Sequence, residues 1–275
     1  MENTWGRRYL MCPPHHFGVL YEINPWMHRE ITVDRDKAHE QWEGLVRTLR
    51  EAGAEVVTMD PHPDWPDMVF TANAGLLSAA TNQFVPSHFR NPERQGETPI
   101  FDAWFTERGY DVDRLPEELD HEGAGDALPF GDVLVSGYRW RSDAASHAVL
   151  SKMLGVAVRS VELVDERYYH LDITFCPLDD RRAMVVPDAW DDYGVRVMKE
   201  LVPEPLVLEA DEAAVFHANS VVVGTTVVMP ACSARVGRQL EAWGFTPVVA
   251  DVGEFLKAGG GVRCLTLSLD VTLGR

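Results

Sequence analysis

A cysteine near the end of the chain follows three successive glycines, in the run GGGVRC at residues 259–264. Three missing Cβ atoms allow the backbone to take φ > 0 or let another group approach closely. Reactive thiols favour partly exposed turns, so Cys264 is predicted to be a nucleophile presented at such a turn. The alternative is a packed cysteine that acts as a small hydrophobic side chain.

Two polar residues, Asp67 and Asn73, flank the apolar run from Val69, which is predicted to be a strand. An aspartate before an apolar run is often only a turn or cap residue. The loop HEGAGD at residues 121–126 places two glycines between two carboxylates. Such a loop is either a simple turn or a place where the backbone comes close to a group that is bound beside an acid. In the second case Glu122 is a candidate functional residue.

A third cluster, His170 and Asp172, opens a predicted strand at residues 173–178. Residues two apart in a strand point to the same face, so the imidazole and the carboxylate are expected side by side. A lone histidine is more often a structural hydrogen-bonding residue. Beside an acid, in a chain with a candidate thiol, it is a candidate general acid/base. Together with Cys264, these groups are the parts that cysteine covalent catalysis requires.

The candidate site contains more acids than bases, which favours a positively charged substrate. A carboxylate about 4 Å from a cation gains roughly 4 kcal/mol at an effective dielectric of about 20, before desolvation. Arg90 and Arg141 suit the opposite task, because the guanidinium fork pairs with a carboxylate through two hydrogen bonds. The alternative for each arginine is an ordinary surface position.

The composition excludes several classes of protein. Hydrophobic residues make up 45% and charged residues 25% of 275 residues, as in ordinary globular proteins. A net charge of −18 disfavours nucleic acid and anionic membrane as partners. The four cysteines have no metal-ligand spacing, so neither a zinc site nor a disulfide framework is indicated. With no apolar leader and no membrane-length apolar run, a reducing cytoplasm is predicted.

Strand and helix patterns recur five times along the chain, each time as two strands, a helix and a strand spaced roughly every 45 to 60 residues. The helices are predicted from residue 34 to about residue 52 and at 99–108, 143–154, 190–201 and 234–243. Glycine and proline punctuate turns without forming a linker, which predicts one domain over residues 1–275. An ordinary mixed α/β sheet is the alternative.

Five motifs occur in order across almost the whole chain: PDxVFTxN, HEGxGD, GYxxR, HLD and GGGxxC. This set resembles the guanidino-group-modifying enzymes of the pentein superfamily. The resemblance implies an α/β fold, a five-bladed α/β propeller of ββαβ repeats around a central active site. It also implies Cys264 as nucleophile, His170 as general acid/base and Glu122 as the carboxylate that orients it. Asp172 and Asp67 would bind the guanidinium.

One departure distinguishes members of this superfamily. Arginine deiminases usually carry aspartate where this chain has Asn73. The stretch TANAG, with INPWM around Asn24 and SHFRNPER around Arg90, is similar to the arginine dihydrolase module of cyanobacterial proteins. That similarity implies conversion of L-arginine to ornithine, ammonia and carbon dioxide, with Asn73 and Asn24 at the substrate.

Two other activities remain as alternatives. Dimethylarginine dimethylaminohydrolases typically have lysine where this chain has Asp172, and an arginine deiminase would stop at citrulline. In either case the resemblance implies a small-molecule substrate, L-arginine or a methylated arginine. It implies no cofactor and no metal. A homo-oligomer is compatible with it. A non-catalytic ribosome-binding protein shares the propeller fold, but a charge of −18 has the wrong sign for RNA.

Overall fold

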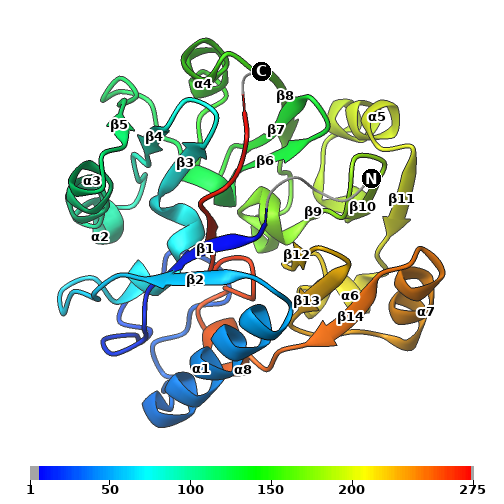
Figure 1. Ribbon diagram of the computed structural model, residues 1–275, viewed down its shortest axis with the longest axis horizontal. Helices are drawn as coiled ribbons and strands as arrows, with labels where there is room; N and C mark the ends of the chain where they lie inside the picture. The colour runs from blue at the N-terminus through cyan, green and yellow to red at the C-terminus, as the bar shows by residue number, and fades with distance from the viewer. Residues whose placement is uncertain (1–5, 274–275) are drawn as a thin grey trace.

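Five three-stranded sheets surround a common centre in the computed structural model, which describes residues 6–273 (Figure 1). In each sheet the middle strand pairs antiparallel with an inner strand and parallel with an outer strand that follows a helix. Four sheets are consecutive in sequence: β3 (Gly75–Ser78), β4 (Gln83–Pro86) and β5 (Asp111–Val112); β6 (Ala127–Phe130), β7 (Val133–Tyr138) and β8 (Ala157–Glu162); β9 (Phe175–Pro177), β10 (Arg182–Val185) and β11 (Glu204–Val207); β12 (Val221–Val223), β13 (Thr226–Met229) and β14 (Thr246–Val249). The predicted five-repeat α/β propeller is confirmed.

The remaining sheet joins the two ends of the chain. Its middle strand, β1 (Arg8–Met11), pairs parallel with β2 (Glu55–Thr58) and antiparallel with β15 (Leu267–Ser268). Leu10 lies opposite Leu267 in this pairing. The last strand therefore closes the ring and fixes the position of Cys264, three residues before it.

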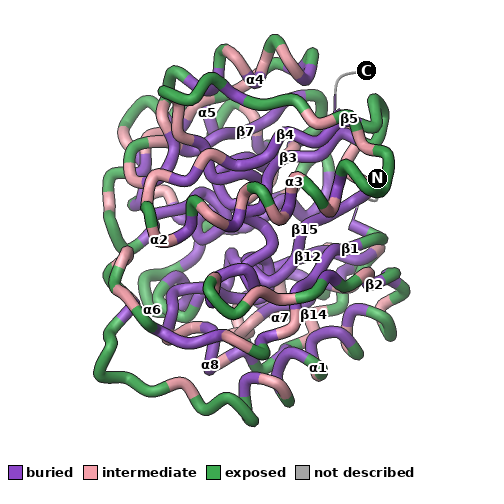
Figure 2. The backbone as a smooth tube through the Cα atoms, turned by 90° about the vertical axis from the view of Figure 1, so that its left-hand side faces the viewer, coloured by how far each residue is buried: buried purple, intermediate pink, exposed green. Residues whose placement is uncertain are grey.

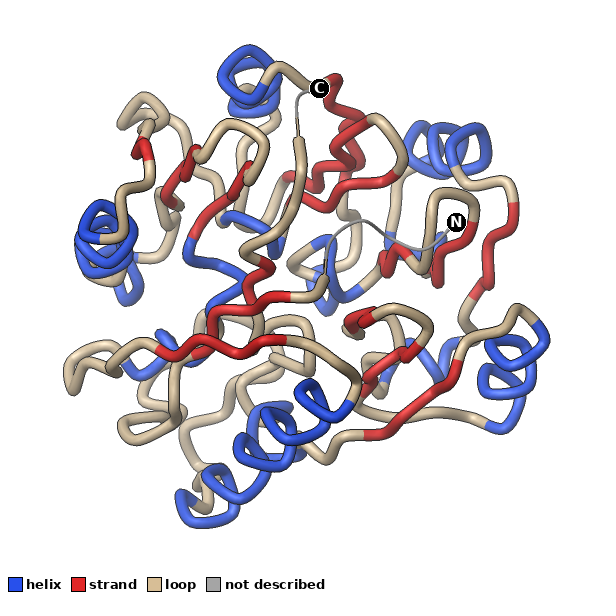
Figure 3. Tube along the Cα trace, in the orientation of Figure 1, coloured by secondary structure: helices blue, strands red, loops and turns tan. Residues whose placement is uncertain are grey.

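The longer α-helices lie around the rim, and short helical turns lie near the centre (Figure 3). The α-helices are α1 (Arg35–Glu51), α2 (Pro92–Gln95), α3 (Thr98–Glu107), α4 (Ser146–Leu154), α5 (Asp192–Leu201), α6 (Ala210–Ala214), α7 (Ala234–Ala242) and α8 (Gly253–Leu256). Helix α1 shows why they form: Asp34 caps its first turn by accepting from Lys37 N, and an apolar stripe that includes Trp42 and Leu45 is buried. The exposed residues lie mostly on the helices, the loops and the outer strands, whereas the inner and middle strands are mostly buried (Figure 2). None of the helices within residues 6–273 is long and apolar enough to cross a membrane.

Short 3₁₀ turns lie between the strands of the described residues. They are η1 (Pro66–Val69), η2 (Thr71–Ala74), η3 (Gly123–Gly125), η4 (Glu166–Tyr168), η5 (Leu171–Ile173) and η6 (Pro187–Ala189). Three of them, η1, η2 and η5, overlap the beginnings of predicted strands. The predicted strand from Val69 is thus wrong up to Ala74, and the strand predicted from residue 173 begins at Phe175. Strand β6 was not predicted, because Pro129 weakens a strand pattern; it is tolerated at the edge of the sheet.

Ring closure by β15 can be tested with Leu267→Ala, since Leu267 is fully buried opposite Leu10. Truncating a buried leucine costs about 2–5 kcal/mol, so urea denaturation should show a loss in that range. Val249→Ala is the matched control, because Val249 in β14 is 55% exposed and should change the free energy of unfolding by less than about 0.5 kcal/mol. Equal losses in both variants would contradict the closure.

Candidate active site

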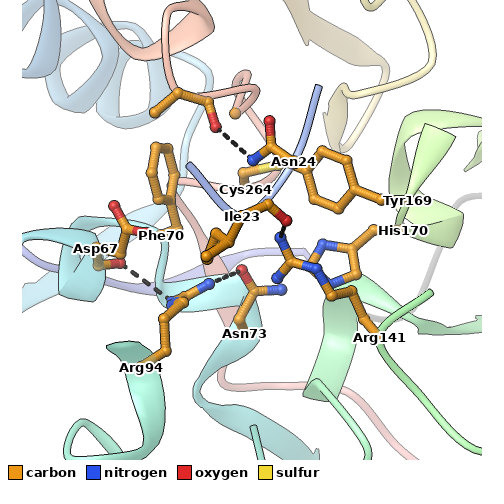
Figure 4. A pocket seen from close by; sticks show the side chains of 12 residues that line it. Ile23, Asn24, Asp67, Phe70, Asn73, Arg94, Arg141, Tyr169, His170 and Cys264 are labelled. Atoms are coloured by element: carbon orange, nitrogen blue, oxygen red, sulfur yellow. Dashed lines mark hydrogen bonds between the residues drawn. The ribbon is translucent and has the colours of Figure 1, made fainter. Parts of the chain in front are cut away.

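A small cavity lies where the 3₁₀ turns, the segment before β15 and the loop after β1 meet (Figure 4). Its lining residues are Ile23, Asn24, Asp67, Phe70, Asn73, Arg94, Arg141, Tyr169, His170, Ala258, Gly260 and Cys264. Six of the nine site residues expected from the sequence are among them. Glu122 and Asp172 lie one contact behind the lining, and Arg90 lies elsewhere.

The thiol of Cys264 lies in the cavity wall but is only 2% exposed. The expectation of a partly exposed turn is therefore wrong: the residue is buried in a ring of turns. The need for glycine is confirmed, because a Cβ on Gly260 would lie 2.2 Å from the Phe70 ring and one on Gly261 2.7 Å from Asn219 Oδ1. Gly259 has φ +80°, which other residues rarely adopt.

Two polar groups touch the sulfur. The thiol donates to Asp172 Oδ2 at 3.5 Å, and Asn219 Nδ2 donates to Sγ at 3.1 Å. Burial, followed by the negative charge of Asp172, raises the pKa of Cys264 well above its ordinary value. Burial also raises the pKa of Asp172 to about 7, against the opposing effect of Arg263. Burial and Asp172 thus favour a neutral thiol, and a bound cation would favour the thiolate.

One carboxylate oxygen holds both the histidine and an arginine. Glu122 Oε2 accepts from His170 Nε2 at 2.9 Å and from Arg141 Nη1 at 2.9 Å. Burial opposes the charge on Glu122, but Arg141 and His170 outweigh it and lower the pKa of Glu122 to about 2. Glu122 is therefore an anion that fixes the imidazole ring, as the resemblance implied.

A buried aspartate links the segments that carry these groups. Asp126 accepts from Leu171 N at 3.0 Å and from Ser142 Oγ at 2.6 Å. Ser142 Oγ in turn accepts from Glu122 N at 3.0 Å. Asp126, the last residue of HEGAGD, therefore ties the backbone beside His170 to that of Glu122. Sequence reasoning gave it no role, although its motif contains it.

Opposite the histidine, Asn73 and Asp67 are held by an arginine that was not among the chosen site residues. Arg94 donates to Asn73 Oδ1 at 2.9 Å and to the Asp67 carbonyl at 3.2 Å. Two further bonds, both at 2.8 Å, pair it with Glu97. Asn73 Nδ2 donates to the Glu122 carbonyl at 3.3 Å, so one amide connects the two halves of the site.

Arg90, the expected carboxylate clamp, does not reach the cavity. Its guanidinium donates to Asp120 Oδ2 at 3.0 Å, to the Arg139 carbonyl at 2.9 Å and to Asp143. These acids keep it outside the ring of turns. Arg94, four residues later in the same SHFRNPER segment, lines the cavity instead; the helical turn of α2 directs it inwards. The neighbouring arginines could not be distinguished by sequence alone.

The loop after β1 covers the cavity through three contacts. Arg141 Nη2 donates to the Ile23 carbonyl at 2.9 Å, Asn24 Nδ2 to the Ala258 carbonyl at 3.1 Å, and Trp26 Nε1 to the Arg167 carbonyl at 2.8 Å. Asn24 thus lines the cavity, but its amide is engaged with the protein. Arg141 likewise has two protein partners.

Buried charge around the cavity is predominantly negative. Five buried carboxyls (Asp67, Glu97, Glu122, Asp126 and Asp172) accompany three buried arginines (Arg94, Arg141 and Arg263). Among residues 6–273, one oxygen of Asp67, of Glu122 and of Asp172 is buried without a hydrogen-bond partner. A buried acceptor without a hydrogen-bond donor destabilises the folded protein. A bound cation that carries several N–H donors would supply the missing hydrogen bonds to these oxygens.

A group with the spacing of metal ligands lies outside the cavity. Glu22, His28 and Glu30 bring one ligand atom each within 4.8 Å of the others, and all three side chains are exposed. None of them lines the cavity.

Comparison with known proteins gives three concordant results. The family model of eukaryotic N,N dimethylarginine dimethylhydrolase matches residues 22–271. The chain is 46% identical over 266 residues to the bifunctional arginine dihydrolase/ornithine cyclodeaminase AgrE of Nostoc sp., covering 94% of this chain but 37% of AgrE. It is 40% identical over 265 residues to N(G),N(G)-dimethylarginine dimethylaminohydrolase of Mycobacterium tuberculosis, covering 96% of this chain and 86% of that protein.

A solved structure of a similar protein has a similar fold. The crystal structure of the N-terminal domain of ArgZ, a cyanobacterial arginine dihydrolase, bound to substrate, has a TM-score of 0.92 and 42% identity. The match covers 97% of this chain and 99% of that one. This chain thus corresponds to one part of the longer bifunctional proteins.

The raised pKa of Asp172 predicts a pH-dependent cost to stability. Because the folded pKa of about 7 exceeds the unfolded value of about 3.9, the cost is absent below about pH 4, grows as pH rises from there to about 7 and is constant at higher pH. Asp172→Asn should therefore be more stable than the wild type by about 1–3 kcal/mol at pH 8, and by much less at pH 5. Urea denaturation at both pH values measures this.

The control for that experiment is Asp132→Asn, which alters an exposed aspartate in the turn between β6 and β7. It should shift the free energy of unfolding equally at the two pH values. If Asp172→Asn increases the free energy of unfolding no more at pH 8 than at pH 5, ionisation of the Asp172 carboxyl does not destabilise the folded protein.

Proposed function

Because the chain belongs to the N,N-dimethylarginine dimethylhydrolase family of the pentein superfamily, we propose that it is a cysteine-dependent hydrolase of the guanidino group. The substrate we propose is L-arginine, converted to ornithine, two ammonia molecules and carbon dioxide. One observation carries the proposal: buried carboxylate oxygens of Asp67, Glu122 and Asp172 without donors lie at or just behind a cavity that a thiol and a histidine both line. A guanidinium supplies five N–H donors and a positive charge to such a site.

In the first half of the reaction, Cys264 Sγ attacks the guanidino carbon. His170 protonates the departing ammonia. The guanidino carbon of the substrate remains bonded to the sulfur as an S-alkylthiouronium intermediate. His170 then takes a proton from water, which attacks the same carbon. Breaking the C–S bond leaves a ureido group and restores the thiol. Asp172 and Asp67 hold the guanidinium, and Glu122 keeps the imidazole aligned.

The second half repeats this chemistry on the ureido group. The sulfur attacks again, the second ammonia leaves, and water cleaves the resulting S-carbamoyl group to a carbamate. Loss of carbon dioxide from the carbamate gives ornithine, so two waters are consumed for two ammonias and one carbon dioxide. Asn73 supports this second cycle, because its amide both donates and accepts hydrogen bonds and can hold a neutral group. The similarity to AgrE and ArgZ supports the same activity.

Hydrolysis of a methylated arginine is the second candidate, favoured by the family and by the Mycobacterium tuberculosis relative. The presence of Asp172 and Asn73, as argued from the sequence, favours arginine. A single propeller unit over residues 1–275 would suffice for either reaction. The cysteines of the described residues are free, which fits the proposed location in a reducing cytoplasm. We also propose that the chain forms a homo-oligomer.

We expect L-arginine to give ornithine and two equivalents of ammonia, because the ureido intermediate stays bound. Asn73→Asp removes the amide donor and should shift the product towards citrulline. Mass spectrometry of the products, with asymmetric dimethylarginine as a parallel substrate, measures both. Citrulline alone from the wild type would identify a deiminase, dimethylamine the methylated substrate, and no turnover of either would overturn the proposal.

We further propose that Arg94 and Arg141, rather than Arg90, recognise the substrate carboxylate. Agmatine carries the guanidinium but lacks that carboxylate. Arg94→Ala should therefore reduce the ratio of kcat/KM for arginine to kcat/KM for agmatine by a hundredfold or more, since buried polar groups left unpaired are costly. Arg90→Ala is the matched control and should keep the ratio within twofold.

Thermal denaturation shows whether the two arginine variants are folded before they are compared. A ratio that changes in Arg90→Ala and not in Arg94→Ala would place the clamp outside the cavity. Arg141→Ala is expected to lower turnover of both substrates as well, because it also removes a partner of Glu122.

A further inference from the structure

Asn219 contacts the candidate nucleophile, although it belongs to none of the five motifs. It is completely buried before β12, and its Nδ2 lies 3.1 Å from Cys264 Sγ. Its other amide atom, Oδ1, accepts from Arg263 N at 3.0 Å and from Cys264 N at 3.3 Å. A backbone N–H can bond only to an acceptor. These two donors therefore fix the amide orientation and direct an N–H at the sulfur.

The turn that carries Asn219 is held firmly. Asn219 N donates to the Phe216 carbonyl at 2.9 Å, and its own carbonyl accepts from Arg263 N at 3.2 Å. Phe216 has φ +62° and is buried, with its ring 4.8 Å from that of Trp26. A non-glycine residue in this region costs about 1–3 kcal/mol and persists where the surroundings hold it. The amide is thus placed before any substrate binds.

The third glycine before the cysteine makes room for this amide. A Cβ on Gly261 would lie 2.7 Å from Asn219 Oδ1, which is closer than atoms can pack without moving. Glycine at this position therefore leaves room for the neutral N–H donor of Asn219 beside the sulfur.

We propose that Asn219 is a further catalytic residue, whose Nδ2 donates to the Cys264 sulfur and stabilises its thiolate. Hydrogen bonds to an ionised acceptor are about twice as strong as those to a neutral one, so the bond favours loss of the thiol proton. The inference takes from the proposed function only that Cys264 is the nucleophile.

Titratable groups from several other elements line the same cavity or contact the sulfur. Asp67 in η1, Arg94 in α2, Arg141 after β7, and Tyr169 and His170 before η5 line the cavity, and Asp172 in η5 contacts the sulfur. The acids oppose a thiolate, and Arg263, adjacent in the chain, offsets Asp172. Asn219 differs from all of them because it favours the thiolate without adding a charge that would repel a cationic substrate.

The test is the rate of Cys264 alkylation by iodoacetamide between pH 6 and pH 10, quantified on the peptide that contains Cys264. Asn219→Asp keeps the shape and the acceptor but replaces the N–H donor with a carboxylate oxygen. Alkylation at pH 8 should be at least tenfold slower than in the wild type, with a midpoint at higher pH. Ser220→Ala is the matched control: it removes a bond of the same turn, from Ser220 Oγ to the His217 carbonyl, and should stay within twofold.

If Asn219→Asp does not fold, Gly261→Ala provides a second variant. Its Cβ displaces the Asn219 amide while Asn219 itself is unchanged, so the same slowing at pH 8 is expected. Wild-type alkylation profiles in whichever variants fold would overturn the proposal, as would equal slowing in Ser220→Ala. Alkylation requires no arginine turnover, so this outcome is independent of the product analysis that tests the proposed function.

Discussion

The burial of charged groups at the propeller centre is the constraint on which the rest of the structure depends. Removing carboxylates from water is costly unless each finds a partner. Here the partners are shared: Glu122 holds both His170 and Arg141, and Arg94 is paired with Glu97 while it also holds Asn73. Residues that must satisfy several partners at once have little freedom. The same network that compensates for burial therefore positions the reacting groups.

The fold meets this constraint by bringing short turns, rather than long strands, to its axis. A strand alternates its side chains between two faces, so it directs only every second residue to one place. The 3₁₀ turns η1 and η2 before β3, and η5 before β9, instead place Asp67, Asn73 and Asp172 towards the centre from two different blades. The sheets outside them supply the apolar core, and β15 carries the cysteine into the ring as it closes the first sheet.

The five repeats were predictable because helix periodicity and short apolar runs are local signals. The motifs likewise identified Cys264, His170, Glu122 and Asp172, which the structure brings together as two contacting pairs, His170 with Glu122 and Cys264 with Asp172, at one cavity. The sequence could not distinguish Arg90 from Arg94, because the choice depends on Asp120 and Asp143, acids distant in sequence that hold Arg90 outside. Asn219 was missed for a similar reason: an asparagine in a turn is an ordinary turn residue. The one available signal was indirect, since three glycines imply that something approaches them closely.

Arg141 connects the proposed carboxylate site to the covering loop. Its Nη1 donates to Glu122 and its Nη2 to the Ile23 carbonyl, which engages two of its five N–H donors, so a substrate carboxylate that took either of these two donors would displace that contact. Losing the bond to Glu122 would leave a buried anion short of a partner, whereas Ile23 belongs to a covering loop whose carbonyl can turn to water. The exchange at Ile23 therefore costs less. On the proposed role of Arg141, a carboxylate that displaced the Ile23 contact would remove one of the three bonds that hold the covering loop, whereas a substrate without a carboxylate would leave that bond intact.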